Sequence, residues 1–247
     1  MILVFLFILL QLCTLSLSDL FFKHQDTGKN KEGKELVSVI LMGDSLVAKS
    51  VRHWNLTERV YDTLSASMPD HDFLVNPFIF GKIGDQKIRK FLEGHKVENP
   101  IPKNVKYKLF YLLWDCDVAD VHEELMSKKE KNKVREKYQS DLNGVLKAIQ
   151  KHGGHIFISS PGILGEGAKK GIRMDKPHYK FIVEGKEAML DAYRDMTKRI
   201  VEKYDGIYID IREAFLEETK DKTWFEGWVT MDGEHPNYKG VEIISTM

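Results

Sequence analysis

Two short motifs near the ends of the chain supply a hydroxyl, a carboxylate and an imidazole. Ser45 lies in Gly43-Asp44-Ser45-Leu46, and Asp232 and His235 lie in Asp232-Gly233-Glu234-His235-Pro236-Asn237. A serine hydroxyl is a weak nucleophile near neutral pH, so it needs a base that takes its proton and a third group that orients the base. A spacing of three residues lets the Asp232 carboxylate reach one ring nitrogen of His235 while the other faces Ser45. The motifs therefore predict a catalytic triad of Ser45, His235 and Asp232.

The sequence before Ser45 predicts how the serine is positioned. Leu36 to Met42 is a short run of mostly aliphatic and β-branched residues that ends at a glycine, a pattern typical of a buried parallel strand. A helix that follows such a strand directs its free N–H groups, and the positive end of its dipole, towards negative charge beside the hydroxyl. We therefore expect the N–H of Ser45 to help bind an oxyanion.

Apolar runs recur along the chain, and stretches with helical periodicity separate most of them. Strands that alternate with helices indicate a parallel sheet covered on both faces. We predict an α/β protein, a three-layer αβα sandwich around a mainly parallel sheet of about five strands, with one helix near Tyr138–Ile149 and another near Met189–Tyr204. The strands are expected at 36–42, 73–80, 109–114, 156–158 and 207–211.

The N-terminus resembles a secretory signal peptide. Residues 1–18 carry no charged side chain and are mostly apolar, and Ser16 and Ser18 are suitably placed for cleavage before Asp19. The alternative is an uncleaved anchor, although the apolar stretch is shorter than the roughly 20 residues that span a bilayer. We expect a signal peptide over 1–18, a lead-in over 19–35 and a single domain over 36–247. The protein is then secreted or resides in the lumen of the secretory pathway, without stable membrane insertion after cleavage.

The composition bears on nucleic-acid binding, on disulfide formation and on glycosylation. The 37 basic and 37 acidic residues balance, so the charge does not indicate nucleic-acid binding. Cys13 lies in the expected signal peptide, which leaves Cys116 as the single cysteine of the mature chain and excludes an intramolecular disulfide. Asn55-Leu56-Thr57 is the only glycosylation sequon, and Asn55 is a candidate acceptor if the chain is exported.

Gly43-Asp44-Ser45-Leu46 followed near the C-terminus by Asp232-x-x-His235-Pro236-Asn237 closely resembles the SGNH (GDSL) hydrolase superfamily. The Gly-x-Ser-x-Gly elbow of the commoner α/β-hydrolases is missing. The resemblance covers nearly the whole mature chain. It implies a flavodoxin-like αβα fold, a serine esterase that needs no cofactor or metal, and a short-chain acyl ester of a carbohydrate or lipid as substrate.

Two further blocks of that family supply oxyanion donors, and one of them diverges here. The resemblance places the backbone N–H of Gly84 in the hole, with Gly81 as a second candidate. Where the family has Gly-x-Asn-Asp, this chain has Trp114-Asp115-Cys116-Asp117, so Cys116 replaces the asparagine. A thiol is a weak donor. Because loss of one good oxyanion donor lowers turnover by about a hundred- to a thousandfold, the substitution predicts reduced activity.

Other interpretations remain open. The divergent block is compatible with an SGNH-fold binding protein that is weakly active or inactive. Asp115 and Asp117 also resemble the Asp-x-Asp motif of glycosyltransferases, in which paired carboxylates hold a divalent metal ion against a nucleotide sugar. That interpretation leaves Ser45 and His235 unexplained. The chain ends within a short closing helix that begins near Val241, and one expectation is that this helix is truncated.

Overall fold

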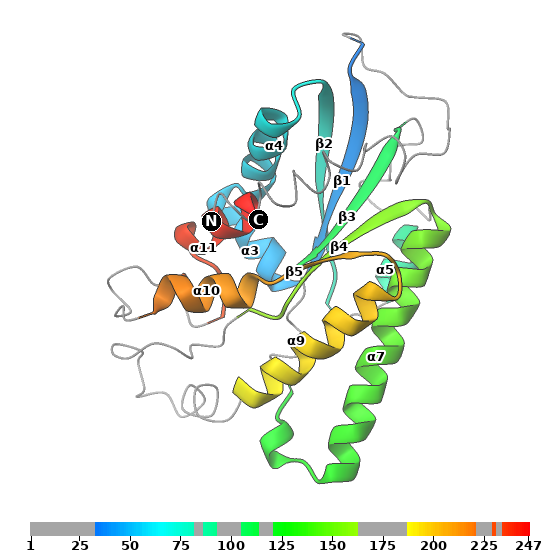
Figure 1. The fold of residues 1–247 in the computed structure, drawn as a ribbon, viewed down its shortest axis with the longest axis vertical. Helices are drawn as coiled ribbons and strands as arrows, with labels where there is room; N and C mark the ends of the chain where they lie inside the picture. Colours follow the sequence, from blue (N-terminus) through cyan, green and yellow to red (C-terminus); the bar gives the residue numbers. More distant parts are fainter. Residues whose placement is uncertain are drawn as a thin grey trace.

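A five-stranded parallel sheet forms the centre of the computed structural model, which describes residues 33–81, 86–92, 105–113, 121–162, 187–220, 229–230 and 234–247. The strands lie in the order β2-β1-β3-β4-β5 (Figure 1). Their bounds are β1 Glu35–Gly43, β2 His71–Ile79, β3 Tyr107–Leu113, β4 Gly154–Ser159 and β5 Ile207–Ile209. All four neighbouring pairs are parallel, which confirms the predicted parallel sheet of five strands.

Helices cover both faces of the sheet and give the predicted three layers (Figure 1). One face carries α3 (Ser45–Trp54), α4 (Leu56–Ser67), α10 (Ile211–Thr219) and α11 (Tyr238–Thr246). The other face carries α5 (Gln86–Leu92), α7 (Lys128–Lys151) and α9 (Glu187–Glu202). A single 3₁₀ turn, η1 (Glu123–Leu125), precedes α7. The α/β fold class is therefore confirmed.

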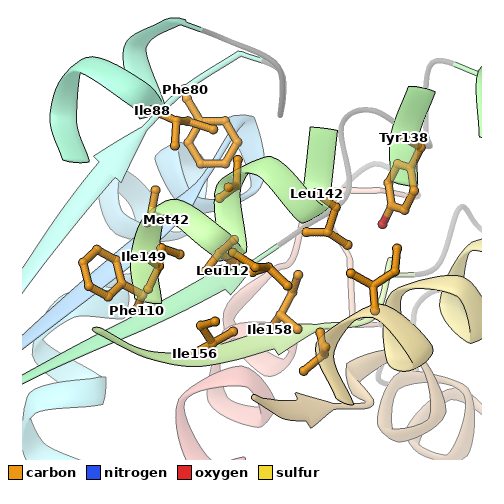
Figure 2. Close-up of a cluster of buried hydrophobic side chains, with 14 of the residues drawn as sticks. Met42, Phe80, Ile88, Phe110, Leu112, Tyr138, Leu142, Ile149, Ile156 and Ile158 are labelled. Carbon is orange, nitrogen blue, oxygen red and sulfur yellow. The ribbon is translucent and has the colours of Figure 1, made fainter. Parts of the chain in front are cut away.

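The alternation of side chains along β1 fits its place in the interior of the sheet, between β2 and β3. Ile40 and Met42 pack in the core beneath α5, α7 and α9, whereas Val39 and Leu41 pack on the opposite face. Successive side chains of a strand point to opposite faces, so a strand between two helical layers must be apolar at nearly every position. Figure 2 shows Met42 among side chains from β3, β4 and α7.

The apolar stripes of α7 and α9 pack on the sheet as the sequence predicts. Tyr138, Leu142, Val145 and Ile149 of α7 are buried, and so are Met189, Tyr193, Met196 and Ile200 of α9. The hydroxyl of Tyr138 also forms a hydrogen bond of 2.6 Å with Oγ1 of Thr197, which joins the two helices. Tyr204, expected at the end of the second stripe, lies beyond α9 and is partly buried.

The fifth strand is shorter than predicted. β5 ends at Ile209, and Asp210 accepts a hydrogen bond from the N–H of Glu213, which caps the start of α10. Ile211, placed by the sequence at the end of a strand, is the first residue of this helix. The sequence did not show this boundary between strand and helix, because the aspartate that caps the helix interrupts the run of apolar residues at one position only.

Candidate active site

Ser45 is the first residue of α3 and lies just beyond the carboxyl end of β1. The carboxylate of the preceding Asp44 accepts a hydrogen bond of 2.7 Å from the N–H of Leu46 and caps the helix. As the first residue of the helix, Ser45 has an N–H without an intrahelical acceptor. The Ser45 side chain is exposed, whereas Asp44 is buried. The local sequence therefore builds a rigid, capped turn that presents one hydroxyl to solvent.

The sheet register places this turn between two neighbouring strand ends. Gly43 pairs with Ile79 at the end of β2 and with Leu113 at the end of β3. The carbonyl of Gly43 also accepts a hydrogen bond of 2.8 Å from the N–H of Phe80, just beyond β2. Segments that follow β2 and β3 consequently start on either side of Ser45.

His235 is held by a short loop that closes onto itself. Thr230 and Pro236 form an antiparallel bridge, and the N–H of Asn237 donates to the carbonyl of Val229 over 3.0 Å. The side chain of Asn237 also accepts from the N–H of Gly240 over 3.1 Å, so it caps α11. Because α11 packs on α3 and α4, this loop is fixed relative to the helix that carries Ser45.

The loop brings the imidazole of His235 onto the hydroxyl of Ser45. Nε2 of His235 lies 2.9 Å from Oγ of Ser45, within hydrogen-bond distance, and the histidine is mostly buried. These two residues are 190 positions apart in the chain. The geometry suits proton transfer between a hydroxyl and an imidazole base.

Two charged residues near the other ring nitrogen were missed by the sequence analysis. Nζ of Lys49 lies 3.0 Å from Nδ1 of His235, and a carboxylate oxygen of Glu234 lies 4.0 Å from the same atom. Lys49 follows Ser45 by four residues on α3, and residues with this spacing lie on the same face of a helix. That spacing was the signal available in the sequence.

The remaining predicted site residues lie outside the described residues. They are Asp232, Gly84, Cys116 and the alternative metal ligands Asp115 and Asp117. Gly81 is described and exposed, two residues after the end of β2. Asn55, the candidate glycosylation site, is exposed between α3 and α4.

A buried arginine, Arg212, lies beyond the carboxyl ends of β4 and β5, at the same edge of the sheet as Ser45. The guanidinium of Arg212 donates to the carbonyl of Gly162 over 3.3 Å and to the carboxylate of Asp191 over 3.2 Å. Its backbone N–H donates to Oγ of Ser160 over 2.9 Å. Arg212 therefore ties the loop that follows β4 to the start of α10.

Within the part of the chain that the structure describes, no group of three or more His, Cys, Asp or Glu side chains could hold a metal ion. Over the same residues, no helix combines the length and apolar character needed to cross a membrane.

Several solved structures with a similar fold are esterases or hydrolases. An acetyl xylan esterase, AlAXEase, is 18% identical to this chain with a TM-score of 0.54, over 84% of this chain and 96% of its own. Axe2, an acetylxylan esterase from Geobacillus stearothermophilus, is 19% identical with a TM-score of 0.56, over 84% and 90%. LAE5, an alpha/beta hydrolase from the metagenome of Lake Arreo, Spain, is 15% identical with a TM-score of 0.57, over 84% and 91%.

Sequence comparison finds no counterpart at the level of a family. No protein-family model matches the chain, and no curated protein matches it by sequence. The likeness to these solved structures therefore concerns the three-dimensional arrangement of the chain. The chain has the fold of the SGNH hydrolases, as the motifs around Ser45 and His235 predicted.

Proposed function

We propose that the protein is a serine esterase that hydrolyses carboxylic esters through Ser45, His235 and Asp232. The observation that carries the proposal is the distance of 2.9 Å between Oγ of Ser45 and Nε2 of His235, just beyond the carboxyl end of β1. The esterases among the structures of the same fold support this class of reaction. The proposal needs no cofactor, because the nucleophile, base and orienting acid are all side chains.

The chemistry takes two steps. Oγ of Ser45 attacks the ester carbonyl while its proton moves to Nε2 of His235, and the same proton then passes to the departing alcohol. Water hydrolyses the resulting acyl-enzyme with His235 as the base, which releases the acid and regenerates the Ser45 hydroxyl. Asp232 would orient the ring through Nδ1, as the motif predicts.

The negative charge of each tetrahedral intermediate needs hydrogen-bond donors. The N–H of Ser45, at the first position of α3, is one donor that the helix leaves available. We propose the N–H of Gly84 as a second donor, because Gly84 follows the end of β2 beside Gly43. Cys116 follows the end of β3 on the other side and would contribute a weak donor at most.

The substrate class follows from the exposure of the nucleophile and from the proteins of similar fold. Ser45 is exposed at the surface of the described residues, which suits an ester carried by a large molecule. Two of the solved structures are acetyl xylan esterases. We therefore propose short acyl esters of a carbohydrate as substrates, with lipid esters as the alternative.

The place of action remains a proposal from the sequence. The charge-free segment 1–18 lies outside the described residues, and β1 begins at Glu35. We propose that this segment directs export and is removed, that residues 36–247 form one domain, and that the enzyme works outside the cell or in the secretory lumen.

A direct assay tests the esterase. The purified protein without residues 1–18 should hydrolyse nitrophenyl acetate and release acetate from acetylated xylan, and Ser45→Ala should abolish both activities. Ser50→Ala is the matched control, because Ser50 is a buried serine of the same helix whose hydroxyl has no hydrogen-bond partner among the described residues. Wild-type turnover no faster than that of Ser45→Ala would exclude the esterase, and retained binding of xylan would then favour the binding-protein alternative.

A further inference from the structure

Three side chains at the surface join the end of α3, the start of α4 and the start of α11. Arg59, near the start of α4, places its guanidinium over the ring of Tyr238, with Cζ 4.3 Å from the ring centroid. Nε of Arg59 donates to the carbonyl of Trp54, the last residue of α3, over 3.0 Å. The rings of Trp54 and Tyr238 meet edge to face, with 6.3 Å between their centroids. Each of these three residues therefore contacts both of the others.

These contacts connect the two segments that carry the candidate site. Tyr238 is the first residue of α11 and follows His235 by three positions. Trp54 ends the same helix that Ser45 begins. Because α3 is one continuous helix, a contact that fixes Tyr238 against Trp54 also limits how far the loop with His235 can shift relative to Ser45.

The contacts of Tyr238 are directional, whereas the apolar packing of α11 is not. Val241 and Ile244 of α11 are buried in the core, and burial of apolar surface does not depend on direction. The hydrogen bond from Arg59 to Trp54 requires a defined geometry, and the two contacts of the Tyr238 ring depend on how the ring is oriented. The directional contacts lie at the end of α11 that adjoins His235.

We infer that Tyr238 is a positioning residue, fixed by Arg59 and Trp54, that sets the placement of His235 against Ser45. The inference rests on the proposed esterase function. Tyr238 is 53% exposed, so it contributes little to the core, and its loss should affect the site more than the stability of the fold. Its ring acts on the reaction through the backbone that joins it to His235.

The inference predicts a loss of kcat when the contact is removed. Because a misplacement of about 1 Å costs up to about a hundredfold in rate, Tyr238→Ala should lower kcat on nitrophenyl acetate by about tenfold or more, with KM unchanged. Tyr238→Phe keeps the ring and should retain the kcat of the wild type. Arg59→Met should lower kcat as well, and the double variant should lose no more than Tyr238→Ala alone, because both residues act through one contact.

Tyr61→Ala is the matched control, because Tyr61 is a tyrosine of α4 that is 41% exposed, and this variant should match the wild type. Urea unfolding shows that each variant is folded under the assay conditions. Tyr238→Ala with the kcat of the wild type overturns the inference. An increase in KM for acetylated xylan, with unchanged kinetics on nitrophenyl acetate, overturns it too, because Tyr238 would then contact the substrate.

Proton–carbon NMR of labelled histidine rings tests the placement of His235 without turnover. His235→Gln identifies the His235 signals by their loss. Arg59→Met removes no aromatic ring, so a shift of the His235 signals in this variant reports displacement of the loop, and we expect such a shift there and none in Tyr61→Ala. Unchanged His235 signals in Arg59→Met overturn the inference, whether or not the protein hydrolyses esters. A wild type without turnover whose His235 signals shift in Arg59→Met would exclude the esterase and support the positioning role.

Discussion

Gly43 and Val47 are packed so closely that a single methyl group would not fit between them. A Cβ atom on Gly43 would lie 2.4 Å from Cγ2 of Val47 and 2.6 Å from the carbonyl oxygen of Leu113. Both distances are well below van der Waals contact, and one of the two atoms belongs to the backbone of β3. The glycine before Asp44 and Ser45 therefore allows α3 to start directly against the sheet.

Gly43→Ala should destabilise the protein and lower its activity. Forcing a methylene-sized group into a packed core costs about 1–3 kcal/mol of the free energy of unfolding. The same strain displaces the turn that carries Ser45, so we expect kcat to fall more than KM changes. Urea unfolding and esterase kinetics measure the two effects.

Gly144→Ala is the control for that substitution. Gly144 lies in the middle of α7, and a Cβ there would meet no atom within 4 Å. Replacement of an exposed helical glycine by alanine stabilises a protein by about 0.5–1 kcal/mol. If both variants unfold at the same urea concentration, the close packing at Gly43 does not limit stability.

The sequence predicts the scaffold well and the contacts of the site less completely. Val39 and Ile40 are successive apolar residues that pack on opposite faces of the sheet, so an interior strand such as β1 is predictable from its composition alone. The pairing of Ser45 with His235 is predictable from two motifs that the resemblance connects. The contact between Lys49 and His235 was missed because the two residues are 186 positions apart, and the four-residue spacing of Lys49 from Ser45 does not by itself show which face of the helix His235 meets.

Arg212→Met should cost more stability than Arg194→Met. Arg212 is almost fully buried and donates to the buried carbonyl of Gly162, and an orphaned buried carbonyl costs about 1–3 kcal/mol. Arg194 pairs with Asp210 in a half-buried position that solvent still reaches, and ion pairs in contact with solvent contribute about 1 kcal/mol or less. Equal unfolding free energies for the two variants would show that Arg212 does not hold the loop after β4.

His155 should make the protein less stable in mild acid. Burial lowers the pKa of His155 below its ordinary value of 6.5. Below that pH the unfolded chain takes up a proton that the folded protein resists, so the contribution of His155 is complete above about pH 6.5 and is lost as the pH falls. The free energy of unfolding of the wild type, minus that of His155→Gln, should decrease from pH 7.5 to 5.5, by no more than about 1.4 kcal/mol per pH unit. A difference that does not depend on pH would contradict the assignment.

Asn55 should be glycosylated when the full chain is expressed in the secretory pathway of a eukaryotic cell. It is exposed between two helices, with a left-handed φ of 53°, and its side chain forms no capping hydrogen bond with α4. The amide is therefore available for modification, and peptide-N-glycosidase should increase the mobility of the secreted protein. Glycine readily adopts the same left-handed backbone conformation, so Asn55→Gly should abolish the change in mobility without strain. Thr57→Ala should abolish it as well. Secreted wild type with the mobility of Asn55→Gly would exclude the site.

Substitutions can show whether Asp232 or Glu234 is the carboxylate that orients the ring of His235. The motif assigns the orienting role to Asp232, whereas the carboxylate of Glu234 lies 4.0 Å from Nδ1, beyond hydrogen-bond distance. A triad that loses its acid, with its geometry kept, loses about 10⁴-fold in kcat, because the base adopts the wrong tautomer. We expect a loss of that order for Asp232→Asn and less than about tenfold for Glu234→Gln, a neighbouring carboxylate that makes no such bond. Steady-state kinetics on nitrophenyl acetate compare the two variants, and a larger loss in Glu234→Gln would transfer the orienting role to Glu234.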